Sequence, residues 1–269
     1  MLIYNNTINI LNLETLENMY LIIFKTVAAT SIFLLTLTAG LLPLKIAKNK
    51  IHFLYLGDAF ASGVFLSAAL LHLLPDADKG FHQILTNHAY PIAQLICVTT
   101  FILLLIMERS ILTYGKHHFS DSKTIAPFLL VLLLSIHSLV EGAAIGTSFS
   151  LAETSMIFFA VIAHKGSESF ALAINLHHYN LSTKNIQKII TIFSFITPLG
   201  IFVASLIMYA LQTSAGNILG ATLNAITAGT FLYLGTEHMV EKTKLFENSI
   251  EILALILGIT LMAVVAIWV

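Results

Sequence analysis

Two apolar stretches of this chain each carry a histidine that is followed four residues later by a glutamate. The first stretch reads HSLVE from residue 137, and the second reads HKGSE from residue 164. Side chains four residues apart lie on one face of a helix, so each stretch presents an imidazole and a carboxylate together. Zinc binds imidazole nitrogen and carboxylate oxygen, and the same ligands suit Fe(II), Mn(II) and Cd(II). The pattern predicts a divalent-cation site of four side chains: His137, Glu141, His164 and Glu168.

The alternative to a metal site is a packed helix pair whose polar side chains hydrogen-bond across the interface. Only the short connection at 149–153 separates the two apolar runs, at 125–148 and 154–178, so we expect antiparallel neighbours. At 1.5 Å per residue, His137 and His164 both lie near the middle of their runs. The matched spacing and depth of the four side chains favour the metal site, where two carboxylates offset the charge of the ion.

The composition indicates that the helices holding these residues lie in a membrane. Of the 269 residues, 57% are hydrophobic and 10% are charged, and the mean hydropathy is +0.89. A soluble domain carries about a quarter charged residues, so a soluble enzyme is excluded, as is a disordered chain. The net charge of -1 provides no basic field for nucleic acid. The single cysteine, Cys97, cannot form an internal disulfide.

Eight runs are long enough for a spanning helix, which needs about 20 apolar residues. They are too long for barrel strands and do not alternate. We therefore predict an all-α integral membrane protein whose residues 1–269 form a single polytopic domain. The predicted helices cover 20–44, 53–75, 90–110, 125–148, 154–178, 187–211, 217–240 and 248–268.

The basic residues between the runs predict the orientation, because cytoplasmic loops carry an excess of Lys and Arg. Lys79 alone falls in the loops of one side. The other side holds Lys45, Lys48, Lys50, Arg109, Lys116, Lys123, Lys184, Lys188, Lys242 and Lys244. The basic side is expected to be cytoplasmic, which places both termini outside.

A shift of 166 residues aligns the second predicted helix with the seventh. The matching pairs are Ala59 with Ala225, Gly63 with Gly229, Phe65 with Phe231, Leu66 with Leu232, and His72 with His238. The two helices are expected to run in opposite directions. Inverted repeats of this kind are typical of transporters, so we predict such a repeat around the central metal-binding helix pair.

The segments HSLVEGAAIG and HKGSESFALA resemble the paired signatures of the ZIP (Zrt/Irt-like) metal transporter family. Further resemblances are FASGVFLSAALLHLLPDA, TPLGI and AGTFLYLGTEHM, so the likeness covers most of the chain from about residue 20. The resemblance implies eight helices with outward termini, divalent-metal uptake into the cytoplasm, and the four His and Glu residues as ligands. It also implies a homodimer.

Two residues beside the ligands are expected to tune the site. Family members often carry an acidic residue where this chain has Lys165, and those members hold two metals. Lys165 resembles the branch with a single metal, because its ammonium beside Glu168 would occupy the second position. Ser138 stands where many members have the stronger ligand Asn. The resemblance therefore implies one transported ion per site.

Polar residues at helix ends suggest a path for the ion. His72 and Asp76 lie four residues apart at the predicted outer end of the second helix, and we interpret them as an entrance. Glu237 and His238 end the seventh helix on the inner side, near Glu108 of the third, and we interpret these as an exit. The alternative is that all five are ordinary interfacial residues.

These patterns predict a transporter and not an enzyme. The expected cargo is zinc, with Fe2+, Mn2+ and Cd2+ also admitted, moved by alternating access with no resident cofactor. An intramembrane metalloprotease would need a pattern such as His-Glu-x-x-His on one helix, and a proton-coupled carrier of a small solute would need more polar groups along the spans. The expected partners are the ion, the lipid bilayer and a second copy of the chain, with no nucleic acid. Short loops favour a multi-pass protein of the plasma membrane, in particular the bacterial inner membrane.

Overall fold

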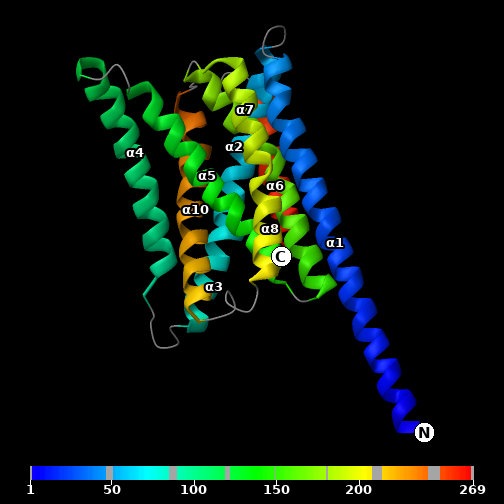
Figure 1. The fold of residues 1–269 in the computed structure, drawn as a ribbon. Helices are drawn as coiled ribbons and strands as arrows, with labels where there is room; N and C mark the ends of the chain where they lie inside the picture. The colour runs from blue at the N-terminus through cyan, green and yellow to red at the C-terminus, as the bar shows by residue number, and fades with distance from the viewer. Residues whose placement is uncertain are drawn as a thin grey trace.

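The computed structural model describes residues 2–46, 51–84, 90–118, 122–148, 150–179, 181–207, 214–241 and 249–267. These ranges are almost wholly helical. The helices are α1 (Leu2–Ile46), α2 (Ile51–Ala68), η1 (Ala69–Leu73), α3 (Leu74–Ile84), α4 (Ile92–His118), α5 (Ser122–Thr147), α6 (Leu151–His178), α7 (Thr183–Ser194), α8 (Ile196–Leu206), α10 (Ser214–Glu241) and α11 (Ser249–Val265). In Figure 1, α1 and α4 lie at opposite edges of the bundle, with α2, α6 and α10 between them.

Six helical stretches within the described ranges are long and apolar enough to cross a membrane. They are Leu16–Ile46, Phe53–Gln83, Leu130–Thr147, Leu151–His177, Thr183–Leu206 and Ile218–Thr236. The apolar parts of α4 and α11, Ile92–Met107 and Ser249–Val265, are shorter. The structure therefore confirms a helical protein with membrane-spanning segments, while the eight spans and the outward termini stay predictions.

The second predicted helix continues through three segments, α2, η1 and α3, and contains a π-helical turn at Ala69–Leu73. Pro75 lies two residues after this turn. Proline lacks an amide hydrogen and its ring collides with the carbonyl four residues earlier, which the wider π turn accommodates. Such turns often occur at functional sites, and this one contains His72.

Hydrogen bonds connect α1, α5, α6 and α8, which we call the site group. The Lys25 ammonium on α1 donates to the carbonyl oxygens of Gly146 (2.7 Å) and Ser148 (2.8 Å) at the end of α5. The Ser169 hydroxyl on α6 donates to the Thr36 carbonyl at 2.6 Å. Lysine near a helix C-terminus satisfies carbonyls that have no partner within the helix, so Lys25 fastens α1 to α5.

Glycines bring α5 and α8 into backbone contact within the site group. A Cβ atom on Gly142 would lie 2.9 Å from the Gly200 Cα atom, and one on Gly146 would lie 2.8 Å from the Ala204 Cβ atom. Small residues allow this close approach between membrane helices. The two helices therefore pack as one rigid pair.

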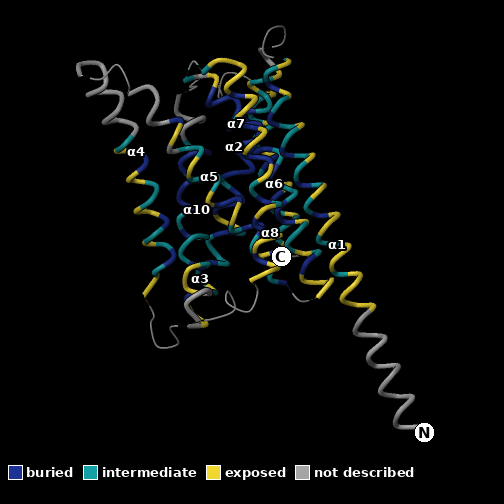
Figure 2. The backbone as a smooth tube through the Cα atoms, viewed as in Figure 1, coloured by how far each residue is buried: buried dark blue, intermediate teal, exposed yellow. Residues whose placement is uncertain are grey.

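Four further helices, α2, α4, α10 and α11, form what we call the repeat group, and their contacts follow the internal repeat. Gly63 of α2 packs against the Leu255 carbonyl of α11, and Gly229 of α10 packs against the Cys97 carbonyl of α4. The two glycines are paired by the shift of 166 residues and make equivalent helix contacts. Figure 2 shows the buried backbone concentrated in the middle of the bundle, where α2, α6 and α10 pass.

Candidate metal centre

The predicted ligands lie on α5 and α6, whose apolar faces place them inside the bundle. His137 and His164 are each 1% exposed, and Glu141 is 7% exposed. The two imidazole ring centres are 5.9 Å apart. Helices α5 and α6 are joined by a short connection, and the Ser150 hydroxyl caps α6 by accepting from the Glu153 amide at 3.2 Å.

Three ligand atoms converge at one point. The Glu141 Oε1 atom lies 3.0 Å from the His137 Nε2 atom and 2.5 Å from the His164 Nε2 atom. Ligand atoms of these three residues all lie within 4.8 Å of one another. A carboxylate oxygen and two imidazole nitrogens are all electron-rich, so they approach this closely only around a shared proton or a cation. The residue types fit zinc, and the three atoms would move slightly apart to bind an ion between them.

Glu168, the fourth predicted ligand, faces a different partner. Its Oε2 atom lies 2.7 Å from the Lys165 ammonium, and its Oε1 atom accepts a hydrogen bond from the Ser138 hydroxyl at 3.3 Å. The same ammonium lies 2.7 Å from the Glu141 Oε2 atom and 2.7 Å from the Ser138 Oγ atom. The ammonium donates hydrogen bonds to Ser138 and Glu141 and forms an ion pair with Glu168, and the lysine is fully buried.

An aromatic ring of α10 lies against the two imidazoles. The Phe231 ring centre is 4.9 Å from that of His137 and 5.8 Å from that of His164, both nearly perpendicular. Phe231 also contacts its repeat partner Phe65 at 4.9 Å. The repeat pattern marked both phenylalanines but did not predict their position beside the site.

The remaining ring nitrogens also bear on ion binding. The Nδ1 atoms of His137 and His164 are buried and have no hydrogen-bond partner within the described ranges. Buried polar atoms are nearly always bonded to protein or to ordered water. These two nitrogens therefore lack the partners that a fully hydrogen-bonded helix interface would give them.

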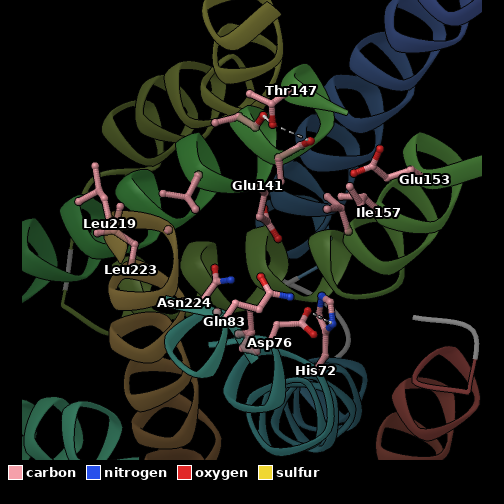
Figure 3. Close-up of a pocket in the computed structure, with 17 residues that line it drawn as sticks. His72, Asp76, Gln83, Glu141, Thr147, Glu153, Ile157, Leu219, Leu223 and Asn224 are labelled. Atoms are coloured by element: carbon pink, nitrogen blue, oxygen red, sulfur yellow. Dashed lines mark hydrogen bonds and ion pairs between the residues drawn. The ribbon is translucent and has the colours of Figure 1, made fainter. Parts of the chain in front are cut away.

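A cavity of about 550 Å³ reaches the site from one end of the bundle. Figure 3 shows Glu141 extending into this cavity, while His72 and Asp76 face each other on the opposite wall. The cavity is lined by η1 and α3, the end of α5 and the beginnings of α6 and α10. It opens on the side that the distribution of basic residues predicts to be outside.

The predicted entrance residues line this cavity. His72 Nδ1 lies 3.1 Å from the Asp76 Oδ2 atom, and the His72 ring centre is 6.4 Å from that of His164. Sequence reasoning missed Gln83, Glu153 and Asn224, which also line the cavity. Gln83 and Glu153 fall between predicted helices and Asn224 falls inside the one predicted at 217–240, so their polarity alone was the available signal. The side chains of the predicted exit residues, Glu108, Glu237 and His238, lie outside the described ones.

Comparison with known proteins identifies the family. The sequence model of the ZIP zinc transporter family matches residues 22–127 and 116–266 of this chain. The chain belongs to the ZIP family. It is 26% identical to zinc transporter ZIP1 of Danio rerio over 295 residues, which cover 91% of this chain and 97% of that protein. It is 27% identical to zinc transporter 11 of Arabidopsis thaliana over 286 residues, covering 94% of this chain and 87% of that protein.

A third relative supports the same assignment. Zinc transporter ZIP1 of Homo sapiens is 29% identical over 222 residues, which cover 67% of each protein. Relatives of this ZIP chain are thus named as transporters and not as enzymes, which confirms the prediction of a multi-pass membrane transporter. The buried group of His137, Glu141 and His164 is where this ZIP chain can hold a metal ion.

Proposed function

We propose that this protein carries a divalent metal ion, zinc before others, across the membrane. The observation that carries the proposal is the convergence of His137, Glu141 and His164 at the floor of a cavity. Ionisable groups inside a membrane are costly and mark functional paths. The names of the relatives, zinc transporters in fish, plant and human, support zinc as the cargo. Imidazole and carboxylate also accept Fe2+, Mn2+ and Cd2+.

We infer that each site transports a single ion. The Lys165 ammonium occupies the space between Glu141, Glu168 and Ser138, at 2.7 Å from one atom of each. A second dication there would add two charges beside a buried cation. In this proposal His137, Glu141 and His164 bind the ion directly, and Glu168 reaches it only by leaving Lys165.

The proposed path begins in the cavity. His72 and Asp76 pair on its wall, and a carboxylate that accepts from one ring nitrogen leaves the other nitrogen available for a metal. The entrance role of these residues is supported by their place between the cavity opening and Glu141. On the opposite side, Glu237, His238 and Glu108 are proposed as the exit.

Movement of the site group against the repeat group would provide alternating access. Lys25 and Ser169 join α1 to α5 and α6, and glycines join α5 to α8, which supports movement as a unit. We propose eight spans in a single domain, both termini outside and transport into the cytoplasm. The homodimer and the plasma membrane, in particular the bacterial inner membrane, stay predictions.

Uptake of radioactive zinc into proteoliposomes tests this function. The wild type should accumulate zinc above protein-free vesicles, and His164→Ala should not. The matched control is His82→Ala, because His82 lies on α3 away from the site and contacts Asp78 at 3.5 Å. If the wild type accumulates no metal, or if His164→Ala accumulates as much as the wild type, the transporter assignment fails.

A further inference from the structure

Helices α5 and α6 carry the same His-x-x-x-Glu pattern in opposite directions, which places the two carboxylates on opposite sides of the imidazoles. Helix α5 ends at Thr147 beside the cavity, and α6 begins beside it. Four helical residues span about 6 Å along the axis. Glu141 therefore lies nearer the cavity than His137, whereas Glu168 lies farther from the cavity than His164.

The surroundings of the two carboxylates differ accordingly. Glu141 lines the cavity and is 7% exposed, and Figure 3 shows it extending into this space. Glu168 is fully buried. An ion arriving from the cavity thus meets Glu141 and the imidazoles before it can meet Glu168.

Lys165 lies between the two carboxylates at equal distance. Its ammonium is 2.7 Å from the Oε2 atom of Glu141 and 2.7 Å from that of Glu168. A lysine ammonium is a compact charge on a flexible stem, so a small movement pairs it wholly with either glutamate. In this structure the other oxygen of Glu141 faces the imidazoles, while both oxygens of Glu168 face Lys165 and Ser138.

The repeated His-x-x-x-Glu spacing, which is separate from the 166-residue repeat, relates the two carboxylates. A shift of 27 residues places His137 on His164 and Glu141 on Glu168. In transporters with inverted repeats, exchanging the roles of related elements converts one facing state into the other. The counterpart of the group His137, Glu141 and His164 is therefore the group His164, Glu168 and His137.

We propose that the ion changes carboxylates during transport. On the cavity side it is bound by the two imidazoles and Glu141, and on the opposite side Glu168 replaces Glu141. Lys165 moves in the reverse sense, from Glu168 to Glu141. In each state one carboxylate binds the ion and the other pairs with the ammonium, so neither buried negative charge is left alone, which would be costly. This inference rests on the proposed transport function.

The test separates binding from turnover. Zinc affinity is measured on purified protein by equilibrium dialysis, and zinc flux is measured in proteoliposomes. Glu168→Gln should bind zinc with an affinity close to that of the wild type but transport it at about a tenth of the wild-type rate or less. Glu141→Gln should lose zinc binding itself. Glu251→Gln, a glutamate in the first turn of α11, is the matched control and should change neither quantity.

A second variant guards against a folding defect in Glu168→Gln. Lys165→Met combined with Glu168→Gln removes both partners of the buried pair, and it should likewise bind zinc and fail to turn over. Equal loss of affinity in Glu141→Gln and Glu168→Gln would show that both carboxylates bind at once, and wild-type turnover in Glu168→Gln would show that the exchange does not occur. Either result overturns the inference. Absence of flux in the wild type would instead refute the transport function, while the binding comparison still distinguishes the two carboxylates.

Discussion

Replacing Lys165 with methionine should make the metal-free protein much less stable and should make its stability depend more strongly on zinc. The ammonium contacts Ser138, Glu141 and Glu168, each at 2.7 Å, and no part of the lysine is exposed. Methionine keeps a long apolar side chain but removes the charge. Two buried carboxylates are then left without their fixed cation.

The magnitude follows from the burial of this group. Removing one partner of a buried ion pair costs about 3 to 5 kcal/mol. For a chain of this size, each kcal/mol corresponds to about 2 to 4 °C in melting temperature, so the expected decrease is about 6 to 20 °C. Zinc at a hundred times its Kd restores about 2.7 kcal/mol, and the variant binds it without repulsion from the ammonium.

Circular dichroism of purified protein in detergent measures the melting temperature with chelator and with zinc. The control is Lys165→Met combined with Glu168→Gln, which leaves Glu141 as the one carboxylate of the two without the ammonium. Because one uncompensated buried charge fewer remains, this double variant should melt at a higher temperature than Lys165→Met in chelator. If Lys165→Met alone melts within about 2 °C of the wild type in chelator, the ammonium does not hold the two carboxylates, and the reasoning is wrong.

Three further outcomes are expected. Gly142→Val should lower the free energy of unfolding by about 1 to 3 kcal/mol through overpacking, because its Cβ would lie 2.9 Å from Gly200 Cα. The control Gly220→Ala, which has open space around its Cβ, should not be destabilised. Equal melting temperatures of the two variants would contradict the packing of α5 against α8. Lys25→Met should lower the free energy of unfolding by about 1.5 to 3 kcal/mol, the contribution of a hydrogen bond from a charged donor. Its zinc affinity in a binding titration should be unchanged, and a changed affinity would contradict the role of Lys25 in joining α1 to α5. Zinc should raise the melting temperature of the wild type and not of His164→Ala, and a similar rise in both would place zinc elsewhere.

Much of the fold could be predicted from the sequence, because the bilayer imposes a simple rule on helix length and polarity. The predicted helix at 154–178 agrees with α6 at Leu151–His178, and the one at 217–240 agrees with α10 at Ser214–Glu241. The π turn at Ala69–Leu73 could not be located beforehand. Pro75 signals a disturbance, but whether the chain kinks, breaks or widens depends on the helices packed around it.

The sequence predicted the residue types of the site but not which side chains each of the two carboxylates contacts. Equal spacing of His137 with Glu141 and of His164 with Glu168 made the two carboxylates equivalent in the sequence. The structure separates them, because the long side chain of Lys165 reaches both and the Ser138 hydroxyl is available to only one. That choice depends on how two helices approach each other, which local spacing does not specify. The sequence also places Lys25 near one end of its predicted helix. Its hydrogen-bond partners, the carbonyl oxygens of Gly146 and Ser148, lie more than a hundred residues away in the chain and could not be named from the sequence.

The size of the cavity determines where an arriving ion loses its water. At about 550 Å³, the cavity is far larger than the roughly 30 Å³ that one water molecule occupies in the liquid. An ion can therefore enter with its hydration shell and exchange water for protein ligands stepwise, completing dehydration only at Glu141 and the imidazoles. Mg2+ gives up its water reluctantly and prefers oxygen ligands, so it can fill the cavity without going further. Discrimination against Mg2+ then depends on the dehydration step at the floor of the cavity.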